Sequence, residues 1–347
     1  MIIDVIKDAL TATTRRVLRQ VLFAGHKLTG AWRYKDELQI TPVPPEAPQL
    51  TCLLGDHPFI LETKITCTND GFTTQRRAAQ MAREHELLLA GIVNSSVHQL
   101  PARPFHGYWV MLPNEGYKTA YLMPGYHANI PEAAEDFTPI ESSAPVLPPA
   151  QLFGPYSMSA GTPFTVPDNL TETFDAYHAL QPAIRQGFLR SCHWLQYANH
   201  AFLHSYSAAF MAIVTAAEVL FPQQPKPKCP SCGQVRHRLR SAFAQLLERS
   251  LTVLTSHRVG EDRTIQARLK HLYDTRSSIS HGADLRGWDL PSEFTPRSSQ
   301  DDDDLRTLLR ITPYTLAQWL REEAGRTAQW GMASSGVKRR SRRKATT

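Results

Sequence analysis

The stretch LYDTRSSISHG, from Leu272 to Gly282, ends a predicted amphipathic helix and places a charge on its apolar side. One face of this helix repeats at spacings of four and three residues, through Ile265, Leu269, Leu272, Arg276 and Ile279. This spacing is the period of a buried helix face, so Arg276 takes a core position. Because an unpaired buried charge costs several kcal/mol, Arg276 should have a partner.

A preceding predicted helix supplies a matching charge. Its apolar face runs through Met211, Val214, Glu218 and Phe221, so a carboxylate again stands among apolar residues. We expect Glu218 and Arg276 to face each other or to line one polar cavity. Taken by themselves, the two residues are also explained by a buried ion pair that only fixes the register of the helices.

His281 adds a third polar group at the end of the same helix. Gly282 directly follows it and is a typical helix stop, so the imidazole lies at the negative end of the helix dipole. Arg276 and His281 lie about 140° apart around an ideal helix, and so do not strictly share a face. The length of arginine, a loosened last turn or a second copy across a dimer axis would bring the two groups together.

These residues resemble the signature of the Apea-like HEPN domains, a family named for higher eukaryotes and prokaryotes nucleotide-binding. The signature is an arginine followed a few residues later by a histidine, and RSSISH, from Arg276 to His281, has this form. AAEVLF, residues 216–221, resembles a segment of an earlier helix of that family, and HRLRSAFAQLL lies between the two motifs. The resemblance covers residues 168–324, about half of the chain.

The resemblance implies a helical bundle that commonly dimerises and, in many members, a metal-independent endoribonuclease. His281 would transfer a proton, Arg276 would stabilise charge on the phosphorus oxygens, and Glu218 would belong to the same site. Ser277 stands where the family often has asparagine, and its hydroxyl can still donate a hydrogen bond. The alternatives are a catalytically silent module that binds RNA, a nucleotide or a protein partner, and a structural dimerisation module.

The same resemblance implies a role in a bacterial toxin or antiviral defence system. RNA is then the expected substrate, a homodimer is the expected assembly, and a protein partner or antitoxin is a further expected contact. The N-terminal part of the chain would sense or gate. Catalysis would need no cofactor.

KCPSCG contains a second chemical motif, a pair of cysteines at Cys229 and Cys232. Such a knuckle suits tetrahedral zinc, which needs four ligands in a closed site. His237 is a candidate third ligand; Cys192, His193 or a second protein copy would supply the fourth. The alternative is a reduced loop with two thiols and no metal.

Two domains are expected from length and pattern, which together make an α+β protein. Residues 1–165 are predicted to form a mixed domain with a helix over 1–25, strands around 31–40 and 58–68, and a proline-rich linker over 130–167. Residues 166–326 are predicted to form an all-α HEPN-like bundle. Residues 327–347 are predicted to be a basic flexible tail.

The formal charge of +6 comes from that tail, because GVKRRSRRKATT alone contains six lysines and arginines. The rest of the chain is near neutrality, so the overall charge does not indicate a basic globular surface. No window reaches the roughly 18 uninterrupted apolar residues of a membrane-spanning helix. With no signal-peptide pattern and an odd number of cysteines, five, we expect a cytoplasmic protein with reduced thiols.

Overall fold

The computed structural model describes residues 14–44, 51–52, 57–67, 71–93, 95–99, 108–112, 116–120, 133–154, 162–202, 204–221, 239–254, 265–281, 289 and 299–341. The chain divides into two compact units. Unit 1 comprises Met1–Leu147 and Tyr156–Pro167, and unit 2 comprises Pro148–Pro155 and Asp168–Thr347. Unit 1 contains the strands and unit 2 is helical, so the α+β class is confirmed.

Unit 1 is built around a five-stranded antiparallel sheet with the order β2-β3-β5-β1-β8. These strands are β1 Thr14–Ala24, β2 Trp32–Tyr34, β3 Leu38–Pro42, β5 His57–Cys67 and β8 Ala133–Ala134. A smaller sheet joins β4 Thr51–Cys52, β6 Tyr108–Leu112 and β7 Gly116–Ala120, and β9 Val146–Leu147 pairs in parallel with β10 Val166–Pro167.

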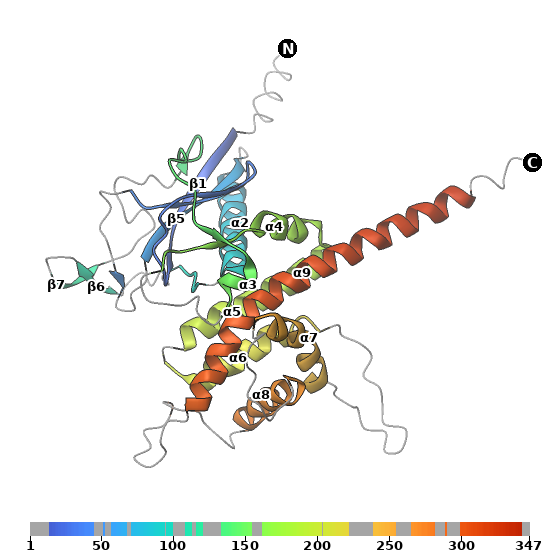
Figure 1. The fold of residues 1–347 in the computed structure, drawn as a ribbon. Coiled ribbons are helices and arrows are strands. Elements are labelled where there is room, and N and C mark those ends of the chain that lie inside the picture. The colour runs from blue at the N-terminus through green and yellow to red at the C-terminus, as the bar shows by residue number, and fades with distance from the viewer. Residues whose placement is uncertain are drawn as a thin grey trace, which may run out of the picture. The chain divides into compact units, whose positions relative to one another are not determined.

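The five-stranded sheet is covered on both faces by other parts of unit 1. Helix α2, Gly71–Ile92, lies along one face (Figure 1), where its His85 contacts Thr63 of β5. Successive strand residues point to opposite faces, so Glu62 points away from α2. That opposite face is covered by the segment around Thr138, which bonds directly to Glu62.

The predicted N-terminal helix is wrong over residues 14–24, which form β1. This strand pairs with β5 along its whole length, from Thr14 opposite Cys67 to Ala24 opposite His57. A helical spacing of apolar residues was therefore overridden by an eleven-residue antiparallel ladder and by burial of Val17 and Leu22. Residues 1–13 lie outside the described residues.

The proline-rich stretch expected to be a linker is in part packed into the fold, although Ile140 and Val146 are exposed. Ala133 and Ala134 pair with β1, and the side chains of Phe137 and Phe164 are buried. Proline and small residues indicate irregular backbone, but they do not tell whether that backbone is covered. The stretch contributes to both units, since Pro148–Pro155 belongs to unit 2.

Unit 2 contains the helices expected from the apolar period of the sequence and the short helix α3, which was not predicted. They are α3 Pro149–Leu152, α4 Leu170–Ala179, α5 Pro182–Ala201, α6 Tyr206–Glu218, α7 Leu239–Leu254, α8 Ile265–Ser280 and α9 Ser299–Ser341. Helix α9 is the longest and contacts α4, α5, α6 and α7 (Figure 1). Trp319 of α9 stacks on Phe188 of α5 with 6.0 Å between the ring centroids.

Helix α9 continues to Ser341, so the first part of the segment expected to be a flexible tail, residues 327–341, is helical. No proline follows Pro313, and the sequence therefore contains no strong helix breaker in this region. Residues 342–347 lie outside the described residues.

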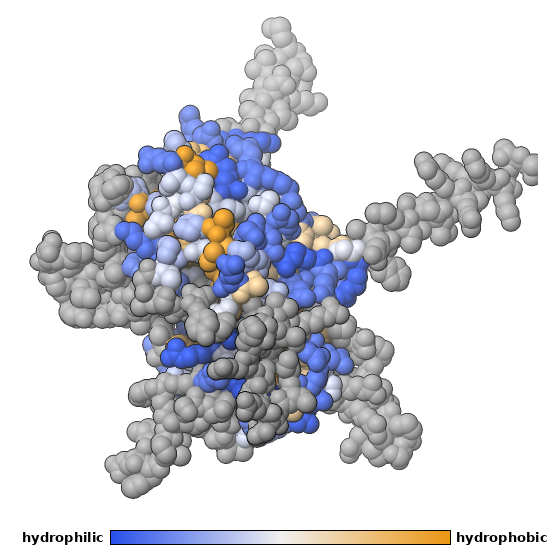
Figure 2. Space-filling view, in the orientation of Figure 1, coloured by the Kyte–Doolittle hydropathy of each residue, from blue (hydrophilic) through white to orange (hydrophobic). Residues whose placement is uncertain are grey.

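Among the residues drawn in colour in Figure 2, most of the visible surface is hydrophilic, with small separate hydrophobic patches. Within the part of the chain that the structure describes, no helix combines the length and the hydropathy needed to cross a membrane.

Candidate functional site

Two helices of unit 2 position the predicted ion pair. Helix α6 begins at Tyr206, where Ser205 accepts a hydrogen bond from the amide of Ala208 and the carboxylate of Asp289 accepts from the first two helical amides. These contacts satisfy amides that have no partner inside the helix. Glu218 is the last residue of α6, and α8 packs beside it.

Arg276 and Glu218 face each other across α8 and α6, as predicted. Arg276 Nη2 lies 3.2 Å from Glu218 Oε2. The side chain of Arg276 is 27% exposed and that of Glu218 is 15% exposed. The pair is therefore partly buried and still accessible to solvent on the arginine side.

Tyr273 is the third member of this cluster and was not predicted. Its hydroxyl donates a 2.7 Å hydrogen bond to Glu218 Oε1, so the two carboxylate oxygens bind different partners. Its ring packs 5.6 Å from that of Phe243 on α7. The pKa of Tyr273 is raised, mainly by burial and secondly by the hydrogen bond to Glu218. The hydroxyl therefore stays neutral and acts as a donor. Its position three residues before Arg276, on the same helix face, is the signal that would have found it.

The guanidinium of Arg276 keeps hydrogen-bonding capacity beyond its contact with Glu218. Among the described residues, only Nη2 of this side chain has a hydrogen-bond partner, and the buried Nε–H has none. A guanidinium has several N–H donors in a fixed fork that matches phosphate oxygens. Arg276 is thus held by Glu218 through Nη2, its Nε–H is buried, and the rest of its side chain is partly exposed to solvent.

His281 and Ser277 lie at the C-terminal end of α8. The amide of His281 donates to the carbonyl oxygen of Ser277 over 3.2 Å, and the hydroxyl of Ser280 donates to the same oxygen. His281 is exposed. In the described part of the chain, its ring makes no hydrogen bond to Arg276 or Glu218, so a single chain does not assemble the arginine and the histidine into one contact.

The predicted zinc ligands Cys229, Cys232 and His237 lie outside the described residues. Cys192, a candidate fourth ligand, is fully buried in α5, and burial raises the pKa of its thiol. Its environment disfavours the thiolate that zinc binds. Within the described ranges there is no group of three or more metal-ligating side chains.

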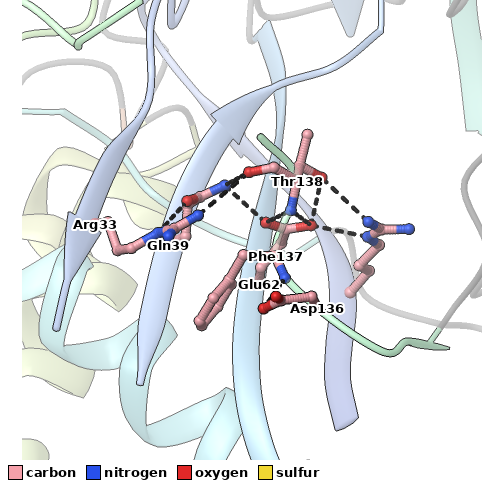
Figure 3. Close-up of polar contacts among 7 residues, drawn as sticks. Arg33, Gln39, Glu62, Asp136, Phe137 and Thr138 are labelled. Carbon is pink, nitrogen blue, oxygen red and sulfur yellow. Dashed lines mark hydrogen bonds and ion pairs between the residues drawn. The ribbon is translucent and has the colours of Figure 1, made fainter. Parts of the chain in front are cut away.

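A second polar cluster, also not predicted, lies on the sheet of unit 1 (Figure 3). The fully buried carboxylate of Glu62 accepts hydrogen bonds from Arg19 Nε, Gln39 Nε2, and both the amide and the hydroxyl of Thr138. Gln39 also donates to the carbonyl oxygen of Thr138 over 2.8 Å. Because these protein donors already satisfy the carboxylate, the cluster fastens the segment around Thr138 to the sheet.

No protein-family model, curated protein or solved structure matches this chain. The chemistry of the two clusters is therefore the basis for assigning a function. Glu62 is fully buried and saturated by protein donors, whereas the Arg276 side chain is 27% exposed, so the cluster of Glu218, Tyr273 and Arg276 is the candidate site.

Proposed function

We propose that unit 2 is a HEPN-type endoribonuclease that cleaves RNA without a metal ion. The observation that carries this proposal is the state of Arg276, whose Nη2 is anchored by Glu218 while its side chain stays 27% exposed to solvent. An anchored and partly exposed guanidinium suits a phosphodiester, whose negative charge increases as it is attacked. The order of Glu218, Arg276 and His281 along a helical unit resembles the HEPN arrangement.

In this mechanism the ribose 2′-oxygen attacks the adjacent phosphorus, and the bond from phosphorus to the 5′-oxygen breaks. His281 takes the proton from the 2′-hydroxyl, and the imidazolium so formed gives a proton to the leaving 5′-oxygen. Arg276 donates hydrogen bonds to the phosphorus oxygens as charge builds on them. Glu218 and Tyr273 are positioning residues that orient Arg276, and Ser277 contributes a hydroxyl at the same end of α8. The products are a 2′,3′-cyclic phosphate and a 5′-hydroxyl.

A homodimer completes the proposed site. His281 is exposed and makes no contact with Arg276 within one chain, so a second α8 would bring another arginine and histidine into reach. Unit 1 would gate this site in a toxin or antiviral defence system, in response to a partner or trigger. A zinc ion on Cys229 and Cys232 would be structural, with no part in the cleavage.

RNA cleavage by the purified full-length protein in EDTA tests this proposal. We expect 2′,3′-cyclic phosphate ends, and loss of cleavage in Arg276→Ala and in His281→Ala. The controls are Arg240→Ala, which removes an exposed ion pair to Asp274 of α8, and His271→Ala, which removes an exposed histidine of α8. Both controls should cleave normally. If the wild type cleaves no RNA in cells or in vitro, even with its partner supplied, the proposed ribonuclease activity is wrong.

The second candidate function is a catalytically silent HEPN module that binds RNA, a nucleotide or a protein partner. It is favoured by the position of His281, whose ring makes no hydrogen bond to Arg276 within the described part of one chain, because cleavage needs both groups at the same phosphate. RNA binding that requires Arg276 but is followed by no cleavage would select this function.

A further inference from the structure

Helix α5 exposes an aromatic face that the proposed cleavage chemistry does not use. This α5 aromatic face consists of four exposed residues: Trp194, its neighbour His193, and Arg190 and Tyr197, which lie four residues before and three residues after Trp194. Trp194 is 36% exposed and Tyr197 is 48% exposed. The opposite side of the same helix is fully buried at Phe188 and Leu195, so α5 does not need these outer rings for its packing.

The rings of this face hold one another in place. Trp194 and Tyr197 meet edge to face, with 5.9 Å between centroids and 88° between planes. The ring of His193 lies 5.9 Å from that of Trp194. Edge-to-face pairs are favourable, so the two large rings are ordered before any ligand arrives, which lowers the entropy cost of stacking.

The charge of α5 limits what the face can bind. The helix contains two arginines and two histidines and has no aspartate or glutamate. The guanidinium of Arg185 donates hydrogen bonds to the carbonyl oxygens of His178 and Leu180. Arg190 is therefore the exposed arginine of this helix. The ligand should therefore combine negative charge with flat rings. A second copy of the same face would bring its arginine against Arg190, which disfavours a symmetric contact.

Helix packing places the middle of α5 beside the end of α6 that belongs to the candidate site. The hydroxyl of Ser191 in α5 donates to the carbonyl oxygen of Ala216 in α6. Ala216 lies two residues before Glu218, at the end of α6 that contacts α8. Residues around Ser191 therefore lie beside the end of α6 that carries the ion pair.

We propose that the α5 aromatic face binds single-stranded RNA by base stacking, with Arg190 contacting the phosphate backbone. The inference rests on the proposed function and adds its substrate class, unpaired RNA. Bases of an RNA duplex are stacked on each other and do not reach a flat aromatic surface, whereas bases of a single strand do.

Fluorescence anisotropy with a labelled 2′-O-methyl oligouridylate of about 20 nucleotides, longer than a typical stacking platform, tests this inference on the full-length protein. This probe has no 2′-hydroxyl and is not cleaved. Trp194→Ala and Tyr197→Ala should each weaken binding by about 5- to 150-fold, the range for loss of one stacked base. Trp194→Phe should keep most of the affinity. Ile140→Ala, at a side chain 42% exposed in unit 1, is the matched control and should bind normally.

Salt dependence separates the two kinds of contact. Arg190→Gln should reduce the slope of log Kd against log salt by about one, whereas Trp194→Ala should lower affinity with little change of slope. Normal binding by both alanine variants, or no binding by the wild type, overturns the inference. So does loss of the dimer in Trp194→Ala, which would identify a contact between copies. Normal cleavage by these variants would contradict RNA binding by the α5 aromatic face but not the proposed ribonuclease activity. RNA binding by the wild type without cleavage would contradict only the ribonuclease activity.

Discussion

Arg276 and Glu218 form an ion pair that joins α8 to α6, with 3.2 Å between Nη2 and Oε2. Glu218 also accepts a hydrogen bond from Tyr273, so loss of the arginine would not leave the carboxylate without a partner. The Glu218 side chain is also 15% exposed to water even with the arginine present. This arrangement separates the contribution of Arg276 to stability from its contribution to chemistry.

Arg276→Ala should lower the free energy of unfolding by only about 1–2 kcal/mol, below the 3–5 kcal/mol typical of a fully buried pair broken on one side. Cleavage should fall by about 100-fold or more, because charge on the phosphorus oxygens loses its donor. Urea unfolding and cleavage rates, measured on the same preparations, check both numbers. A stability loss of about 3 kcal/mol or more, with activity falling only in proportion to the folded fraction, would identify a purely structural pair.

The pairing of Arg276 with Glu218 was predictable because each charge interrupts an apolar helix face. Tyr273 was not predicted because a tyrosine on a half-buried face breaks no pattern. The contact between Glu62 and Thr138 could not be predicted from the sequence for a different reason, because 76 residues separate the partners and no local period connects them. Strand β1 was missed because its partner β5 decides its conformation.

Gly30 should be intolerant of any side chain. A Cβ atom at this position would lie 2.3 Å from the carbonyl oxygen of Ser143, which belongs to the backbone that bridges to Ala31. Gly30→Ala should therefore destabilise the protein by about 1–3 kcal/mol, as overpacking does, measured by urea unfolding. Gly325→Ala is the control: no atom would lie within 4 Å of its Cβ, and alanine favours the α9 helix there. Equal stability of the two variants would contradict the close approach.

Unit 1 should lose stability in mild acid. Burial lowers the pKa of His26, and burial together with the nearby charges of Lys27 and His26 lowers that of His57. Below about pH 6.5 the unfolded chain takes up protons that the folded unit resists, so stability is retained above that pH and falls as the pH drops toward the lowered pKa values. Urea unfolding between about pH 7.5 and pH 5.5 should show this loss, and a His26→Gln, His57→Gln variant should show less of it. If the free energy of unfolding depends on pH in the same way in the variant and the wild type, these histidines are not the cause of the loss in acid.

The purified protein should contain zinc bound through Cys229 and Cys232. Cys229→Ser and Cys232→Ser should each release the metal and lower the thermal stability, because a structural site contributes directly to folding. Cys67→Ser replaces a cysteine at the end of β5 and serves as the control, with no change in metal content expected. Wild-type protein that carries no zinc after purification without chelators would leave KCPSCG as an ordinary loop.

The basic segment at the end of the chain should strengthen RNA binding through charge alone. GVKRRSRRKATT, residues 336–347, contains six cationic side chains, and α9 extends into it as far as Ser341. Each phosphate that these side chains neutralise adds about one unit to the slope of log Kd against log salt. Deletion of Gly336 to Thr347 should therefore weaken RNA binding at low salt and flatten the slope, while the cleavage rate at saturating RNA stays the same. A variant with all six residues changed to glutamine keeps the length of the segment and should match the deletion. An unchanged slope in both variants would show that the segment does not contact the phosphate backbone.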